Sequence, residues 1–133
     1  MSQENVDRLR AAYDYTARTG EMQRELLHRE FVWDMTTFRD AILPGTYVGV
    51  DGANRFLAEW LESFEYWPID LEEIFDFGER VVAVARQRGQ TRQGTPEVEM
   101  RFAMLWTLRD GLAVRMEMYA NPNEPFEAAG PRE

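Results

Sequence analysis

Two segments near the end of the chain carry large apolar side chains at alternate positions and are joined by Arg109-Asp110-Gly111. The first, residues 100–108, carries Met, Phe, Met, Trp and Leu at its even positions, and the second, residues 112–120, carries mostly Val and Met at its own. Side chains of a strand point alternately to two faces, so the pattern predicts a β-hairpin with one face of sulfur and aromatic groups. Such a face either fills a core or lines an apolar cavity.

The register of this hairpin depends on the length of its turn. A three-residue turn with Gly111 in the left-handed region pairs Trp106 with Val114. A two-residue turn at Asp110 and Gly111 would instead set Trp106 against Arg115 and mix apolar and charged side chains on one face. We therefore predict the three-residue turn, with the even-numbered side chains of both strands facing the helices.

Composition limits the classes of protein to be considered. The 133 residues, 44% of them hydrophobic, fit one folded domain spanning 1–133. A net charge of -9 opposes binding to nucleic acid or to an anionic membrane. Without a membrane-spanning apolar run or the features of a signal peptide, a cytoplasmic protein is expected. Because cysteine is absent and His28 is the single histidine, we predict neither a metal site nor a cofactor.

The spacing of apolar residues predicts helices first and strands afterwards. Helices are expected over residues 2–20, 21–28 and 51–67, with a strand at 31–35 between the second and third. Strands are then expected over residues 69–77, 80–92, 97–108 and 112–120, followed by a short terminal helix at 126–129. This order predicts an α+β domain in which the helices cover one face of a sheet.

The order of elements, together with four short motifs, resembles the SnoaL-like proteins of the nuclear transport factor 2-like (NTF2-like) superfamily, which have the cystatin-like fold. The motifs are Pro44-Gly45-Thr46-Tyr47-x-Gly49, Arg80-Val81-Val82, Arg86-Gln87-Arg88-Gly89 and Trp106-Thr107-Leu108-Arg109-Asp110-Gly111. The resemblance covers nearly the whole chain. It implies a cone-shaped barrel, in which N-terminal helices pack on a strongly curved mixed or antiparallel sheet around an apolar pocket. Members include polyketide cyclases, ketosteroid isomerases and limonene-type epoxide hydrolases, and most are homodimers.

The resemblance implies reactions that can be checked residue by residue. A ketosteroid isomerase needs a carboxylate base and an oxyanion hole formed by a tyrosine and a protonated aspartic acid. Tyr13 falls at the position of the tyrosine, but the base position falls on Met35 and the second acid near Met104. Asp34 is next to the base position and points the opposite way in a regular strand. Since a thioether accepts no proton at neutral pH, Tyr13 and Asp34 remain the catalytic candidates.

A limonene-type epoxide hydrolase needs an Asp-Arg-Asp set, with a tyrosine and an asparagine that hold the water. Arg86 matches the arginine, but its two acidic partners fall on Arg88 and Met118. Trp33 and Met35 occupy the water-holding positions. The polyketide cyclases use a single aspartic acid, for which no position of this chain is identified. The acid-base sets of the isomerase and the hydrolase are therefore absent.

A ligand pocket is predicted from the aromatic and methionine side chains that the resemblance places inside the cone, together with two arginines. The predicted lining residues are Tyr13, Trp33, Met35, Phe56, Trp60, Trp67, Arg86, Arg88, Met100, Phe102, Met104, Trp106, Met116 and Met118. Taken singly, each aromatic or methionine residue is more simply explained by core packing, and Tyr13 could bury its ring and donate to a backbone carbonyl.

Arg86 and Arg88 share a face of their strand and are predicted to lie toward the open end of the pocket. They either pair with acidic residues such as Asp34, Glu72 or Glu99 in a solvated rim, or form a fork for a carboxylate on an otherwise apolar ligand. Salt screens the acidic field of the chain within roughly 10 Å, so a local pair of guanidinium groups can still hold an anion. We therefore expect an apolar ligand with one acidic or carbonyl oxygen.

Three classes of function are consistent with the sequence. The first is a pocket protein that binds a small hydrophobic molecule without transforming it. The second is an enzyme of the cyclase, isomerase or hydrolase type with a non-standard acid-base set that uses Asp34 or Tyr13. The third is an interaction protein with an incidental pocket. A homodimer is expected through the second sheet face, which carries Leu105, Arg115 and Tyr119, because that face mixes apolar and charged groups.

Overall fold

The computed structural model describes residues 2–37, 45–62, 64–66, 69–91 and 98–126. Helix α1 spans Ser2–Thr19 and helix α2 spans Gly49–Glu62, with a 3-10 turn, η1, at Arg24–Leu26. The strands are β1 (Leu27–Asp34), β2 (Thr46–Val48), β3 (Phe64–Tyr66), β4 (Ile69–Asp76), β5 (Arg80–Thr91), β6 (Val98–Arg109) and β7 (Leu112–Tyr119). In this part of the chain no helix is long and apolar enough to cross a membrane.

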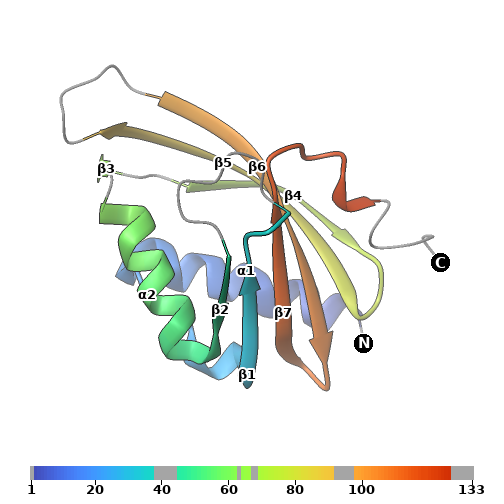
Figure 1. The fold of residues 1–133 in the computed structure, drawn as a ribbon. Helices are drawn as coiled ribbons and strands as arrows, with labels where there is room; N and C mark the ends of the chain where they lie inside the picture. Colours follow the sequence, from blue (N-terminus) through green and yellow to red (C-terminus); the bar gives the residue numbers. More distant parts are fainter. Residues whose placement is uncertain (1, 38–44, 63, 67–68, 92–97, 127–133) are drawn as a thin grey trace.

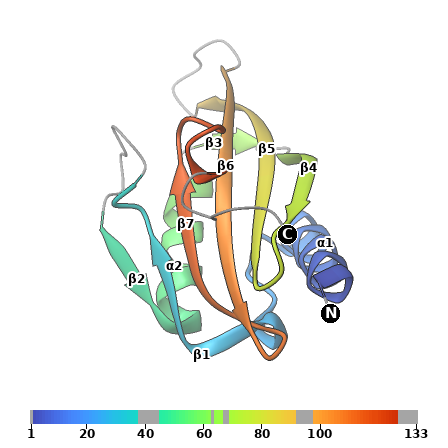
Figure 2. The same cartoon turned by 90° about the vertical axis from the view of Figure 1, so that its right-hand side faces the viewer.

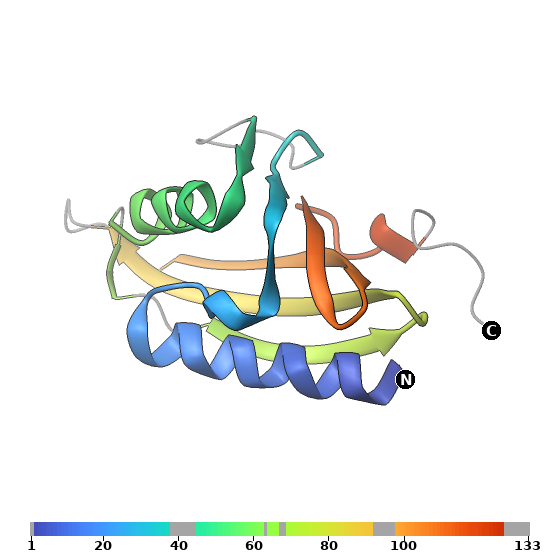
Figure 3. The ribbon, with the colours of Figure 1, turned by 90° about the horizontal axis from the view of Figure 1, so that it is seen from below.

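The strands form one mixed sheet in the order β2-β1-β7-β6-β5-β3, with β4 also paired to β5. Strands β1 and β7 run parallel, and every other pair is antiparallel. The sheet bends so strongly that β1 runs across the direction of β4 and β5 (Figure 3). Helix α1 lies along β4, and α2 lies beside β1 and β2 (Figures 1 and 2). The predicted α+β architecture, with helices packed on a strongly curved mixed sheet, is confirmed, and the sheet stays open and does not close into a barrel.

Apolar side chains pack on both faces of the sheet. The inner face, toward the helices, holds the main core, in which Leu9 of α1, Phe31 of β1 and Phe56 of α2 are almost fully buried. The outer face holds a smaller cluster, made of Val82, Val84, Ala103, Leu105 and Tyr119, with Phe75, Phe77 and Phe126 packed against it. Phe126 follows β7, so the segment after the last strand helps to cover the outer face.

The β6–β7 hairpin faces the way the sequence predicts, but with a different turn. Arg109 pairs with Leu112, so the turn has two residues, and both Asp110 and Gly111 have positive φ angles, 52° and 82°. This is the geometry that a two-residue hairpin turn favours. An irregularity after Thr107 then leaves Val114 without an opposing residue, as in a β-bulge.

The two-residue turn alone would turn Met116 and Met118 to the outer face of the sheet. The bulge at Val114 returns them to the inner face. Trp106 lies opposite Met116, and Met104 lies opposite Met118, and all four side chains are buried on the inner face. The prediction that even-numbered residues face the helices is confirmed for β6 and for Met116 and Met118 of β7. It was wrong before the bulge, where the odd-numbered Ala113 lies opposite Leu108 in the inner core. The predicted pairing of Trp106 with Val114 was wrong, because one extra residue is taken up in the strand and not in the turn.

Several predicted element boundaries also need correction. The helix expected over residues 21–28 is only the turn η1, because β1 begins at Leu27 to pair with β7. His28 therefore lies in a strand, where its Nδ1 atom accepts a hydrogen bond from the backbone N–H of Glu30. Helix α2 starts before Asp51 and ends before Phe64, which lies in β3. Residues 46–48, where the sequence predicts neither a helix nor a strand, form the edge strand β2. The terminal helix expected at 126–129 lies almost wholly outside the described residues.

Candidate functional site

A cavity of about 80 Å³ lies between the two helices and the inner face of the sheet. Its described lining residues are Ala12, Tyr13, Thr16, Ala17, Met22, Gln23, Leu26, Trp33, Phe56, Leu57, Trp60, Leu71, Gln87, Phe102, Met104, Trp106 and Met118. One water molecule needs roughly 10–15 Å³ of such space, so the cavity holds more than a single trapped water. None of these described lining residues carries a charge.

Aromatic rings from four elements, α1, β1, α2 and β6, form much of the wall. The ring of Phe56 lies 4.7 Å from that of Trp33 and 5.8 Å from that of Trp60, measured between ring centroids. The ring of Tyr13 meets that of Trp106 edge to face at 6.1 Å. Rings packed at such distances hold one another in place, so the wall is preformed.

The hydroxyl group of Tyr13 is held by two side chains of β6. It accepts a hydrogen bond of 2.9 Å from Nε1 of Trp106 and donates to Sδ of Met104 over 3.1 Å. The backbone carbonyl expected as its partner is replaced by a thioether, which is a weak acceptor. Burial raises the pKa of Tyr13 far above its ordinary value, and the bond from Trp106 offsets only part of that rise. Tyr13 is therefore a neutral phenol at physiological pH.

Gln87 is the polar residue of this cavity that the sequence analysis missed. It lies on β5, is 1% exposed, and accepts a hydrogen bond of 2.9 Å at Oε1 from Nε1 of Trp60. Its Nε2 atom is buried and has no hydrogen-bond partner among the described residues. Because Gln87 stands between two arginines, the sequence suggests that it is exposed to solvent. The pairing of β5 with β6 shows that it points inward.

The structure brings together about half of the predicted pocket. The predicted residues that line the cavity are Tyr13, Trp33, Phe56, Trp60, Phe102, Met104, Trp106 and Met118. Met35 and Met116 are buried elsewhere in the same core, and Met100 is partly buried against it. Trp67 lies outside the described residues.

Arg86 and Arg88 do not line the cavity. On β5, Ala85 lies opposite the inward-facing Phe102, so the odd-numbered residues face inward and both arginines lie on the outer face. There Arg86 forms ion pairs with Glu72 at 2.9 Å and with Glu99 at 3.2 Å. Arg88 pairs with Asp70 at 3.8 Å. The predicted fork for an anion was wrong, and the alternative of pairing with acidic side chains is confirmed.

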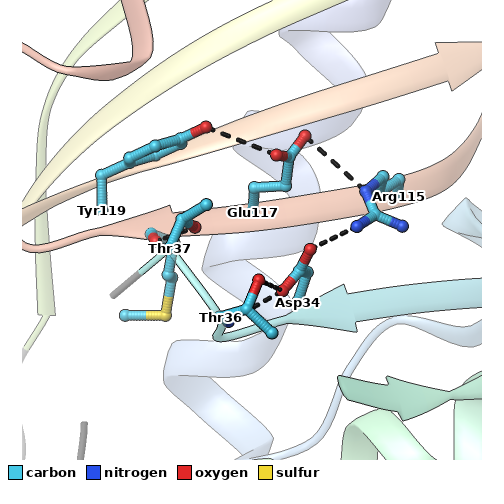
Figure 4. Close-up of polar contacts among 7 residues, drawn as sticks. Asp34, Thr36, Thr37, Arg115, Glu117 and Tyr119 are labelled. Carbon is cyan, nitrogen blue, oxygen red and sulfur yellow. Dashed lines mark hydrogen bonds and ion pairs between the residues drawn. The ribbon is translucent and has the colours of Figure 1, made fainter. Parts of the chain in front are cut away.

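Asp34 does not line the cavity, whereas its neighbour Trp33 does, as expected for alternating residues of a strand. Its carboxylate points toward Arg115 of β7 (Figure 4). Its carboxylate accepts hydrogen bonds from the backbone N–H of Thr36 at 2.8 Å, from the hydroxyl of Thr36 at 2.6 Å, and from Arg115. Burial opposes ionisation of Asp34, but these hydrogen bonds and the charge of Arg115 outweigh it and lower the pKa of the carboxyl group. Asp34 is therefore a structural anion that joins β1 to β7.

The same cluster continues along β7. Arg115 also approaches Glu117 at 3.7 Å, and the hydroxyl of Tyr119 donates to Glu117 over 3.3 Å (Figure 4). Burial, followed by the charge of Glu117, raises the pKa of Tyr119 to about 12. Of the two catalytic candidates, Tyr13 of α1 lines the cavity, whereas Asp34 pairs with Arg115 outside its described lining, so the structure does not bring the two together in one site.

The sequence profile of the SnoaL-like domain matches residues 6–116, which include every described lining residue of the cavity except Met118. The match also includes Asp34, Thr36 and Arg115 of the Asp34 cluster. The chain belongs to the SnoaL-like family. None of the curated proteins matches the sequence at a significant level.

Solved structures support the same fold for this SnoaL-like domain. The protein TerC, co-crystallised with polyporic acid, is 25% identical, with 96% of this chain and 99% of that chain covered and a TM-score of 0.76. An NTF2-like protein of unknown function from Burkholderia pseudomallei K96243 is 20% identical, with 96% and 98% covered and a TM-score of 0.76. A protein from Jannaschia sp. CCS1 assigned as a SnoaL-like polyketide cyclase is 21% identical, with 98% and 94% covered and a TM-score of 0.73.

The SnoaL-like cavity has a limited chemical capacity. Tyr13 is the one titratable side chain among its described lining residues, and that phenol stays protonated. The described residues also contain no group of three or more acidic or histidine side chains placed to hold a metal ion. The described wall can therefore exclude water, pack against an apolar body and offer neutral hydrogen bonds.

Proposed function

We propose that this SnoaL-like domain binds a small, mainly apolar and uncharged organic molecule in the inner cavity. The observation that carries the proposal is the described lining, which consists of aromatic, methionine and aliphatic side chains with a few neutral polar groups and no charge. Ligand sites commonly combine such an apolar wall with a small number of placed polar groups. The similarity to TerC, which was crystallised with polyporic acid, supports a small-molecule role.

The positions of Arg86 and Arg88 give no support for an anionic ligand in the cavity. Arg86 and Arg88 lie on the far face of the sheet, and an unpaired carboxylate inside an apolar cavity would lose its hydration without a compensating charge. The ligand that fits is therefore neutral, and its oxygen is a carbonyl or ether oxygen.

A cyclase-type reaction is the second candidate, and Tyr13 is the observation that favours it. Its hydroxyl donates only to a thioether, so a ligand carbonyl would be a stronger acceptor for the same hydrogen. That bond would polarise the carbonyl but would not remove a proton from the ligand. Because no described lining residue can act as a base at neutral pH, binding without proton transfer is the better-supported function.

The proposal is tested by blocking the cavity from helix α1. Ala12 lines the cavity, whereas its neighbour Ala11 is exposed. Titration calorimetry with acetophenone and ethylbenzene should show binding to the wild type and to Ala11→Met. Ala12→Met, whose longer side chain enters the cavity, should bind both at least tenfold more weakly. Equal binding by the two variants, or no binding by the wild type, would refute a ligand site in this cavity.

A mass spectrum of the freshly purified protein under native conditions complements this titration. A co-purified molecule should add a discrete mass to the wild type and to Ala11→Met, and should be absent from Ala12→Met. An adduct that persists unchanged in Ala12→Met would place the bound molecule outside the cavity.

A further inference from the structure

We infer that Gln87 is the recognition residue of the cavity and that its side-chain N–H group donates a hydrogen bond to a carbonyl or ether oxygen of the ligand. The inference rests on the proposed function and names the chemical class of molecule that the cavity selects. Gln87 is 1% exposed and lines the cavity, and its Nε2 atom is buried without a partner among the described residues.

The orientation of the amide follows from its neighbour on α2. The indole nitrogen of Trp60 can only donate, so the atom of Gln87 that lies 2.9 Å from it must be the oxygen Oε1. Rotating the amide by half a turn would set two donors against each other. Trp60 therefore fixes Gln87 so that its two N–H donors are left for another partner.

A buried amide donor without a partner is costly, and such groups in native proteins call for an explanation. Here the surrounding wall offers mostly rings, thioethers and methyl groups, which accept hydrogen bonds poorly or not at all. A ligand oxygen would satisfy the donor, whereas a hydrocarbon of the same shape would leave it unpaired.

A second donor points to the same ligand chemistry. Trp33, 6% exposed, also lines the cavity, and its Nε1 atom is likewise buried without a hydrogen-bond partner among the residues that the structure describes. Both unpaired groups are donors and both are neutral. The described wall is thus complementary to a molecule that accepts hydrogen bonds, and no described lining residue supplies a cation for a carboxylate.

The test compares two probes of nearly the same shape, acetophenone with a carbonyl group and ethylbenzene without one, by titration calorimetry. Gln87→Met removes the donor at nearly constant side-chain length. Arg88→Met, on the same strand but on the outer face, is the matched control. We expect Gln87→Met to weaken acetophenone binding about tenfold, the scale of one neutral hydrogen bond, and to leave ethylbenzene binding equal or stronger. Arg88→Met should change neither affinity.

The role of Gln87 and the existence of the binding cavity can fail separately. If Gln87→Met weakens both probes equally, or weakens neither, the role of Gln87 is refuted while the binding cavity stands. If neither probe binds the wild type, the proposed function and this inference both fail.

Nuclear magnetic resonance of the wild type gives a second readout, which does not depend on a folded variant. The side-chain amide proton resonances of Gln87 should move downfield with acetophenone and stay nearly still with ethylbenzene. Identical shifts with both probes would contradict a hydrogen bond.

Discussion

The indole N–H of Trp106 donates to the hydroxyl oxygen of Tyr13 over 2.9 Å, and this bond fastens helix α1 to the middle of the sheet. The Tyr13 hydroxyl in turn donates to Sδ of Met104. This buried hydroxyl therefore both accepts and donates a hydrogen bond. This bond sets the distance between α1 and β6, and therefore the width of the cavity at that point.

Tyr13→Phe should lower the free energy of unfolding by about 1–3 kcal/mol, because the Trp106 N–H is left buried without its acceptor. Urea unfolding followed by far-ultraviolet circular dichroism measures the change. Tyr15→Phe, on the same helix but half-exposed, is the control and should stay within about 0.5 kcal/mol of the wild type. Equal stability of Tyr13→Phe and the wild type would mean that the bond does not contribute.

Asp34 should make the stability of the protein depend on pH. Its folded-state pKa is lowered, so its ionised form stabilises the fold above the unfolded-state pKa, and this contribution is lost as the pH falls through the folded-state value. Asp34→Asn should therefore be less stable than the wild type by about 1–3 kcal/mol at pH 7. The difference should shrink as the pH is lowered below about 5.

Urea unfolding at several pH values between 7 and 3 measures this convergence. Asp70→Asn is the matched control, because Asp70 is exposed and its ion pair with Arg88 spans 3.8 Å, so its removal should change stability little at any pH. A difference between Asp34→Asn and the wild type that stays constant down to pH 3 would argue against a charge-dependent role for Asp34.

The variant Arg86→Met tests whether Arg86 binds an anionic ligand, as the sequence suggested, or only pairs with Glu72 and Glu99, as the structure indicates. Because Arg86 lies on the outer face with Glu72 and Glu99, its removal should leave the affinity for acetophenone unchanged, and benzoate should bind poorly to both proteins. The half-exposed ion pairs should be worth no more than about 1 kcal/mol of stability. A selective loss of benzoate binding in Arg86→Met, measured by calorimetry, would restore the anion site.

A homodimer through the outer face stays a prediction, but two of the three residues that were expected to contact the partner are buried within the single chain. Leu105 and Tyr119 are 2% and 7% exposed within the single chain, so Arg115, whose side chain is 42% exposed, is the one predicted contact residue that a partner could reach readily. Light scattering should return twice the chain mass of 15.6 kDa. The chain mass itself, over a wide range of concentrations, would exclude the dimer.

The sequence predicts the faces of β6 and β7 because their methionine side chains, together with Phe102 and Trp106, lie at alternate positions on one side. It cannot do so for β5, where Val81 and Ala83 on one face and Val82 and Val84 on the other are all apolar and all buried. Alternation therefore groups Arg86 with Val82 but does not say which face is inner. Only pairing with β6 decides the side, and the same ambiguity hides Gln87.

The missed bulge has a similar cause. Asp110-Gly111 strongly favours a two-residue turn, while the apolar pattern requires that even positions share a face, and the two demands conflict unless one residue is left over. The chain satisfies both by placing the extra residue, Val114, within the strand. The sequence shows which turn is favoured and which residues are apolar. It does not show where the extra residue goes, because that depends on tertiary packing.

The central claim, that the inner cavity is the ligand site, is tested most directly by nuclear magnetic resonance of the protein labelled at its methionine methyl groups. Met22, Met104 and Met118 line the cavity, while Met35 and Met116 are buried in the same core away from its described lining. Titration with acetophenone should shift the first three methyl resonances saturably and move the other two far less. Unchanged resonances, or equal shifts at all five methyl groups, would contradict the account.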